Sequence, residues 1–251
     1  MKKTIYIVAV AIFALSCKEK ETSQPVESVE PVDKVTTTPE KQTIQEAMVL
    51  FDGSNFDAWK GYGVDEMHEE WSIDGDAMVF TPSGEGGKNI ITKGTYKNFI
   101  LELEWKISEG GNSGIFWGVH ESPEFKEAYE TGPEIQVLDD ERHPDAKVAN
   151  GTHKAGSLYD MIKPEDGMIN PAGEWNRVKL MINHDQNIGK LSLNGKNAFT
   201  FPVNGEKWDA MVSKTKFADW EGFGKYPEGH IGLQDHGDKV WYRNITIKEI
   251  N

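Results

Sequence analysis

The chain of 251 residues is poor in cysteine and in positive charge. It contains a single cysteine, so no disulfide can form within the chain. Lysine and arginine together number 27, against 41 aspartate and glutamate residues, and the formal net charge is −14. This excess of negative charge argues against nucleic acid as a partner. The sequence also lacks a GxGxxG motif, a P-loop, a CxxC pair, an internal repeat and a long helical period.

The single cysteine directly follows a short apolar segment. Two lysines precede an apolar run, residues 5–15, that is too short to span a bilayer. We therefore predict that residues 1–16 are a lipoprotein signal peptide. Residues 14–17, Ala-Leu-Ser-Cys, resemble a bacterial lipobox. Cys17 is thus expected to carry lipid and to anchor the mature protein to a membrane of the bacterial cell envelope, facing the periplasm or the exterior. An ordinary signal peptide is the alternative.

Two regions of different composition follow the signal. Residues 17–46 are rich in Glu, Lys, Thr, Pro and Ser and have hardly an aromatic side chain, which predicts a disordered tether. Residues 47–251 contain short alternating runs separated by turn-forming residues. Residues 99–107 place apolar and charged side chains on opposite faces, and Asn194-Gly195 indicates a tight hairpin. This domain is predicted to be all-β, a jelly-roll sandwich of two antiparallel sheets.

The last predicted strand has a cation where aliphatic side chains are usual. Alternation over residues 241–247 places Arg243 on the same face as two isoleucines. A two-residue turn at 237–238 would pair this strand with the preceding one and bring Gln234, His236 and Arg243 together on the inward, concave face. The alternative is that the arginine is a structural cation neutralised by a buried carboxylate.

A second polar cluster lies near the middle of the chain. Alternation places Glu134 and Gln136 on one face of a strand, which Asp139 can rejoin only through a bulge. Jelly-roll glucanases space two catalytic carboxylates in a similar way, but the middle acid is glutamine here, which weakens a conventional glycosidase interpretation. Together with His143 and His236, the two acids make a candidate oxygen and nitrogen ligand set for a divalent ion.

Six segments of the chain carry a family resemblance: "LFDGSNFDAWKGY", "GGNSGIFWGV", "PEIQVLDDERHPDA", "GSLYDMIKP", "AGEWNRVKLMIN" and "GHIGLQDHGDKVWYRNITIKEI". Together they resemble the 3-keto-disaccharide hydrolase family, also described as 3-keto-glucoside 1,2-lyase and 3-keto-2-hydroxyglucal hydratase. The resemblance runs from about Met48 to Glu249. It implies a concanavalin-like jelly roll, and many members of this family are secreted or lipid-anchored.

The resemblance implies cleavage of 3-keto-glycosides, in which a partner sugar 3-dehydrogenase has oxidised the C3 hydroxyl to a ketone. The ketone makes the C2 hydrogen acidic, so its removal allows β-elimination of the glycosidic oxygen from C1. Hydration then completes a net hydrolysis. This chemistry needs a base near C2, an electrophile on the C3 oxygen and an acid for the leaving oxygen. One divalent metal ion could supply the electrophile.

The candidate residues fall into three groups under this hypothesis. The catalytic candidates are Glu134, His236 and Asp139. The substrate-binding candidates are Asn112, Gln136, Tyr159, Gln234 and Arg243, although Asn112 could simply form a turn and Tyr159 could be a half-buried core phenol. The metal-ligand candidates are Glu134, His143 and His236. Two alternatives from other classes remain open: a carbohydrate-binding module without catalysis, and a conventional retaining glycosidase.

Overall fold

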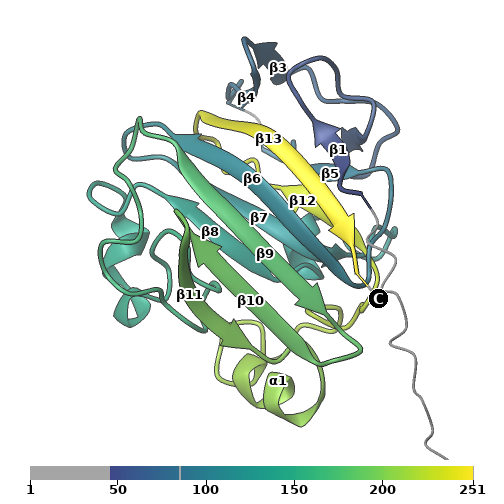
Figure 1. The fold of residues 1–251 in the computed structure, drawn as a ribbon, viewed down its shortest axis with the longest axis vertical. Helices are drawn as coiled ribbons and strands as arrows, with labels where there is room; N and C mark the ends of the chain where they lie inside the picture. The colour runs from purple at the N-terminus through teal and green to yellow at the C-terminus, as the bar shows by residue number, and fades with distance from the viewer. Residues whose placement is uncertain (1–45, 85, 251) are drawn as a thin grey trace, which may run out of the picture. The chain divides into compact units, whose positions relative to one another are not determined.

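The computed structural model of the protein describes residues 46–84 and 86–250 (Figure 1). The predicted signal peptide, Cys17 and all but the last residue of the predicted tether lie outside this part of the chain. The described residues belong to one compact unit, Thr43–Asn251. No helix among them is long and apolar enough to cross a membrane.

The larger sheet has eight antiparallel strands and faces the viewer in Figure 1, with β7, β8 and β12 of the second sheet behind it. Asn194 and Gly195 both have positive φ angles, 49° and 80°, and connect two of its strands, so the predicted hairpin is confirmed. In spatial order, the strands are β11 (Lys196–Phe201), β10 (Ile188–Leu193), β9 (Asn176–Asn183), β6 (Phe99–Ile107), β13 (Val240–Glu249), β4 (Ala77–Phe80) and β3 (Trp71–Asp74), with β1 (Met48–Phe51) also paired to β13.

The smaller sheet has five antiparallel strands. They are, in spatial order, β2 (Trp59–Gly61), β5 (Ile90–Thr92), β12 (His230–Leu233), β7 (Asn112–Val119) and β8 (Glu134–Leu138). Within the described ranges, the helical elements are short: α1 (Gly205–Val212) and the 3-10 turns η1 (Ala128–Glu130), η2 (Pro144–Lys147) and η3 (Ala149–Gly151). The predicted all-β sandwich of two antiparallel sheets is confirmed.

The core lies between the two sheets and follows from strand alternation. Phe99, Leu101 and Trp105 of β6 point inward and are almost completely buried, while Glu102 and Lys106 point to the other face and are partly exposed. Burying one such apolar side chain contributes about 1.5–3 kcal/mol. The predicted alternation over residues 99–107 is therefore confirmed, and it fixes which face of each sheet looks toward solvent.

Strand β8 is buried along its whole length because its free edge is also covered. The backbone N–H of Gln136 donates to the Ser157 carbonyl at 3.0 Å, and the N–H of Gly156 donates to the Gln136 carbonyl at 2.8 Å. The N–H of Tyr159 donates to the Glu134 carbonyl at 3.0 Å. These bonds give β8 a partner on the side where the sheet ends and hold Tyr159 beside Glu134.

The predicted face of Arg243 is wrong, and a bulge explains the error. Asn244 has a φ of 51°, and the register between β13 and β6 shifts between Arg243 and Thr246. Such a bulge inserts one residue and changes which side chains face inward. Tyr242 is buried before the bulge and Ile245 after it, so Arg243 lies on the outer face and does not share a face with the isoleucine.

The predicted pairing of the last two strands is also wrong. β12 pairs with β5 and β7 in the smaller sheet, whereas β13 pairs with β6, β4 and β1 in the larger one. Residues 234–239 therefore cross from one sheet to the other instead of forming a two-residue turn. The backbone N–H of Gln234 still bonds to the Gly114 carbonyl at 2.9 Å, so Gln234 stays with the smaller sheet.

Candidate active site

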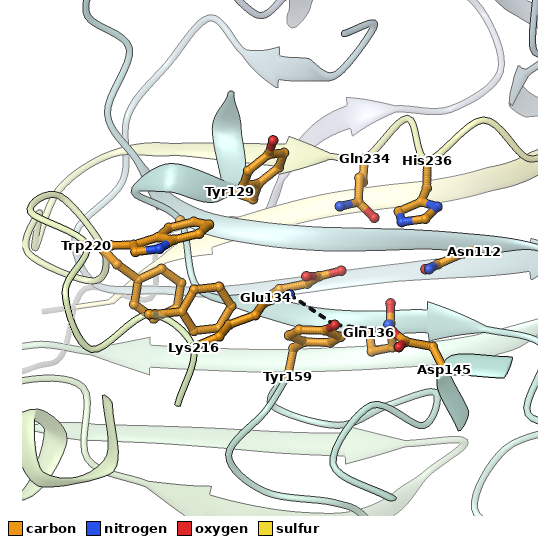
Figure 2. Close-up of a pocket in the computed structure, with 13 residues that line it drawn as sticks. Asn112, Tyr129, Glu134, Gln136, Asp145, Tyr159, Lys216, Trp220, Gln234 and His236 are labelled. Carbon is orange, nitrogen blue, oxygen red and sulfur yellow. Dashed lines mark hydrogen bonds between the residues drawn. The ribbon is translucent and has the colours of Figure 1, made fainter. Parts of the chain in front are cut away.

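A pocket with a volume of about 310 Å³ opens on the outer face of the five-stranded sheet. Its floor comes from β7, β8 and the residues after β12, and its walls come from η1 and the loops that contain residues 145–159 and 216–223 (Figure 2). It is lined by Asn112, Tyr129, Gly132, Glu134, Gln136, Asp145, Tyr159, Lys216, Phe217, Trp220, Phe223, Gln234 and His236.

Glu134 lies at the centre of the pocket floor. Phe116 of β7 is its partner in the ladder, and Gly114 pairs with Gln136 two residues further along. A Cβ atom at Gly114 would overlap the Glu134 carboxylate oxygen, so the absence of a side chain at this position makes the space in which the carboxylate lies. The sheet therefore presents one carboxyl group between two strands, at the bottom of the pocket.

The carboxyl group of Glu134 lies in an environment that favours its neutral form. The residue is only 8% exposed, and its carboxylate has no hydrogen-bond partner in the described part of the chain. Burial raises its pKa to about 8, the positive charge of Lys216 opposes this rise, and the negative charge of Asp145 adds to it. Near neutral pH, Glu134 can both hold and release a proton, as a general acid or base must.

Two amide oxygens in the pocket lack hydrogen-bond partners. The Oδ1 atom of Asn112 and the Oε1 atom of Gln234 are buried, and neither accepts a hydrogen bond from any described residue. The Oε1 atom of Gln136 accepts the backbone N–H of Val137 at 3.0 Å. A buried acceptor without a partner costs about 1–3 kcal/mol, so these amides are suited to a ligand that supplies hydroxyl groups.

A network of charged groups surrounds the Tyr159 hydroxyl. It donates to Oδ2 of Asp145 at 3.2 Å and accepts from Nζ of Lys216 at 3.1 Å (Figure 2). The His153 ring lies between two carboxylates, with Nδ1 at 3.2 Å from Asp145 and Nε2 at 3.0 Å from Asp160. Burial and the neighbouring negative charges raise the pKa of Tyr159, so its hydroxyl stays protonated.

Six of the predicted site residues line the pocket, namely Asn112, Glu134, Gln136, Tyr159, Gln234 and His236. His143 lies nearby: its ring centroid is 6.2 Å from that of His236, and its Nδ1 atom accepts the N–H of Asp145 at 3.2 Å as the N-cap of η2. The other seven lining residues, among them Asp145, Lys216 and Trp220, were not predicted. They lie outside the strands, in loops and short 3-10 turns, where strand periodicity gives no signal.

The placement of Asp139 and Arg243 in the site is wrong. Asp139 turns away from the pocket and accepts the backbone N–H groups of Gly110 at 2.7 Å and of Glu141 at 3.0 Å, so it organises a loop. Arg243 lies on the other sheet, where its Nε atom is 2.7 Å from Glu104. No bulge follows Glu134 that could return Asp139 to its face, and the bulge in β13 turns Arg243 outward.

The predicted metal ligands do not form a ligand group. Among the described residues, no three His, Cys, Asp or Glu side chains are arranged to hold a metal ion. Glu134 and His236 line the same pocket, while the Nδ1 atom of His143 is engaged with the backbone. As placed, these residues do not together form a metal site, and a divalent ion as the electrophile stays a prediction from the sequence.

A two-sheet sandwich whose outer pocket combines unpaired amides, a carboxyl group and aromatic rings is suited to carbohydrate ligands. The 3-keto-alpha-glucoside-1,2-lyase-like domain family matches residues 46–248. The 3-keto-disaccharide hydrolase of Bacteroides thetaiotaomicron is 32% identical, in an alignment that covers all of both chains. The chain therefore belongs to the 3-keto-alpha-glucoside-1,2-lyase-like family, which confirms the predicted resemblance and places it among enzymes that act on glycosides.

Solved structures agree with this assignment. A candidate glycosyl hydrolase from Parabacteroides distasonis is 31% identical, with a TM-score of 0.74 over 82% of this chain and 94% of that one. A Bacillus subtilis protein of unknown function with a galectin-like fold is 13% identical, with a TM-score of 0.50 over 83% of this chain and 98% of that one. The second likeness concerns the fold alone.

Proposed function

We propose that this protein cleaves 3-keto-glycosides by removing the C2 proton, eliminating the leaving group from C1 and hydrating the product. The environment of Glu134 is the observation that carries the proposal. Its carboxyl group lies at the bottom of the pocket without a hydrogen-bond partner in the described ranges, and burial raises its pKa to about 8. Such a group is a better base than an exposed carboxylate and is matched to a carbon acid activated by a ketone.

The steps balance with one protein carboxylate. The C2–H bond breaks, its proton moves to Glu134, and its electron pair forms an enolate on the C3 oxygen. The enolate returns to the ketone as the C1–O bond breaks and a C1–C2 double bond forms, and the leaving oxygen takes the proton from Glu134. Water then adds its oxygen to C1 and a proton to C2. The products are the 3-keto sugar and the free alcohol, without an oxidant or reductant.

The side chains around Glu134 fit the remaining needs of this reaction. The side-chain amides of Asn112 and Gln234, together with His236, line the same end of the pocket and can orient the sugar hydroxyls and donate to the C3 oxygen (Figure 2). The Lys216 ammonium, bonded to the Tyr159 hydroxyl at 3.1 Å, adds a positive charge that favours the enolate. Substrate orientation and charge stabilisation thus come from different residues.

The test compares two compounds that differ only in the oxidation state of carbon C3. Purified protein is incubated with methyl 3-keto-glucoside and with methyl glucoside, and released methanol is measured. Cleavage of only the keto compound supports the proposal, and incorporation of solvent deuterium at C2 during turnover would identify the proton-transfer step. Equal cleavage of both compounds would indicate a conventional glycosidase, and binding without cleavage of either would indicate a carbohydrate-binding module.

One feature of the pocket disfavours a conventional glycosidase. Such enzymes use two free carboxyl groups on opposite sides of the scissile bond. The second carboxylate in the pocket lining, Asp145, accepts from the Tyr159 hydroxyl and faces the His153 ring at 3.2 Å.

Because the ketone must be formed first, the proposal also requires a sugar 3-dehydrogenase upstream. Lipidation of Cys17 and a location in the cell envelope remain predictions from the sequence.

A further inference from the structure

The pocket has two chemically different ends, with Glu134 between them (Figure 2). The end that contains Asn112, Gln234 and His236 is polar. The opposite end is a wall of four aromatic side chains. We call it the aromatic wall, and it consists of Tyr129, Phe217, Trp220 and Phe223.

The aromatic wall is a packed structure with two accessible rings. The rings of Phe217 and Phe223 stack at 4.0 Å and are buried, and Trp220 meets Phe217 edge-on at 5.0 Å. Tyr129 is 38% exposed, and its ring centroid is 6.0 Å from that of Trp220. Buried phenylalanines thus support a tyrosine and a tryptophan that still have surface to offer a ligand.

The wall is also fixed by the backbone. The N–H of Gly224 donates to the Thr131 carbonyl at 2.8 Å and ties the loop that contains Trp220 to the end of η1. A Cβ atom at Gly222 would lie 2.5 Å from the Phe125 ring, so this loop packs closely against the segment that precedes Tyr129. The two halves of the wall are therefore held together before any ligand arrives.

The side chains of the aromatic wall offer few polar groups. Only the Tyr129 hydroxyl and the Trp220 indole N–H are available on them, whereas the unpaired amide oxygens belong to Asn112 and Gln234 at the other end. A second sugar at the wall would find few partners for its hydroxyls, while an aromatic ring needs none. This end of the pocket is therefore suited to binding a flat apolar group.

The order of the sugar carbons determines which part of the substrate reaches the wall. If Glu134 removes the C2 proton, C1 and C3 lie on either side of it. The C3 oxygen gains negative charge and belongs at the polar end, where Asn112 and His236 can donate. The C1 substituent, which leaves, then points toward the aromatic wall.

We propose that the aromatic wall is a leaving-group subsite for aromatic aglycones, so that the substrates include 3-keto-glycosides of phenols. This inference rests on the function proposed above. A phenol has a pKa of about 10, so its oxygen departs more readily than that of a sugar alcohol. The Lys216 ammonium lies 5.2 Å from the Phe217 ring centroid, so a positive charge lies beside the aromatic wall.

The test is a binding measurement on glycosides that cannot react. Phenyl glucoside, methyl glucoside and a glucose disaccharide, all without a 3-keto group, are titrated calorimetrically into the full-length protein and its Trp220→Ala variant. Phenyl glucoside should bind about tenfold more tightly than the other two, as expected for one stacked ring, and Trp220→Ala should remove this preference. Trp175→Ala, which changes a partly buried tryptophan on the other sheet, should keep it.

The outcomes separate the subsite from the catalytic proposal. Turnover of methyl 3-keto-glucoside tests the catalysis, and a tenfold increase in KM for the phenyl compound alone in Trp220→Ala tests the subsite. If no 3-keto compound is cleaved, the binding preference still decides whether the subsite exists. Equal binding of all three glycosides, or tighter binding of the disaccharide, would overturn the inference. If Trp220→Ala does not fold, Tyr129→Ala, which changes a more exposed ring, gives the same test.

Discussion

The outer faces of the two sheets carry similar acidic and aromatic side chains, but these side chains have partners on one face and lack them on the other. On the eight-stranded sheet, Glu104 pairs with Arg243 at 2.7 Å and Glu102 pairs with Lys179 at 2.9 Å. On the five-stranded sheet, the Glu134 carboxylate has no hydrogen-bond partner among the described residues. Both faces carry acids beside strands, but only one of them leaves an acid unsatisfied.

Tryptophans differ between the two faces in the same way. On the larger sheet, the Arg243 guanidinium lies 4.0 Å from the Trp175 ring centroid and Lys106 lies 4.5 Å from that of Trp241, so cations cover both rings. Trp220 in the pocket packs instead against the aromatic rings of Tyr129, Phe217 and Phe223. The comparison teaches that a binding face is distinguished by groups left without partners, and that charged and aromatic residues alone do not reveal it.

The largest expected effect comes from the unpaired acid. Glu134→Gln removes the base while preserving shape, so turnover of a 3-keto-glycoside should fall by about 10²–10⁴-fold. Melting temperature should stay the same or rise, because the variant no longer buries an ionisable group. Glu174→Gln, the same change at an exposed position, should alter neither quantity. A Glu134→Gln variant that retains full turnover would leave the pocket without its base and would end the proposed mechanism.

A smaller effect is expected when the Glu134 carboxyl group is kept but displaced from its position. Gly114→Ala puts a methyl group where the Glu134 carboxylate lies, and a shift of about 1 Å in a reacting group can cost about 10²-fold in rate. Overpacking should also lower the free energy of unfolding by about 1–3 kcal/mol. Gly86→Ala is the matched control, because a Cβ there meets open space. Rates measured well below both melting temperatures would separate displacement from unfolding.

The raised pKa of Glu134 predicts the dependence of activity on pH. Only the ionised form can act as a base, so kcat/KM should increase about tenfold per pH unit up to the folded pKa of about 8 and then level off. Burial raises this pKa from 4.5, so the folded state binds the proton more tightly than the unfolded state does. The free energy of unfolding contributed by this group should therefore fall between about pH 4.5 and pH 8. Titration of stability in Glu134→Gln should lack this decrease.

The sequence allowed a correct prediction wherever local periodicity determines which way a side chain points. Alternation in β8 predicted that Glu134 and Gln136 share a face, and both line the pocket. The Asn194-Gly195 turn was predicted because its backbone angles require such residues. These features depend on neighbours along the chain, so a single sequence contains enough information to find them.

Features that depend on distant contacts escaped prediction. Asp145 on η2 and Lys216 on a loop are about seventy residues apart in the chain, and both contact the Tyr159 hydroxyl. The bulge at Asn244 reversed the predicted face of Arg243, because a positive φ at one residue shifts the phase of a strand whose sequence alternates without a break. Nothing in the alternation marks that position.

The smallest effect is expected from the residue that looked most functional in the sequence. Arg243 is paired with Glu104 and with Asp76, at 3.0 Å, on a partly exposed face. Pairs of this kind contribute about 0–1 kcal/mol, so Arg243→Ala should lower the free energy of unfolding by about that amount and leave turnover within about twofold. Denaturant unfolding and initial rates on a 3-keto-glycoside measure both quantities. A loss of about 10²-fold in turnover with unchanged stability would mean that the larger sheet takes part in the reaction. The contrast between the two faces would then no longer hold, because a fully paired cation would contribute to the chemistry that is assigned to the unpaired acid.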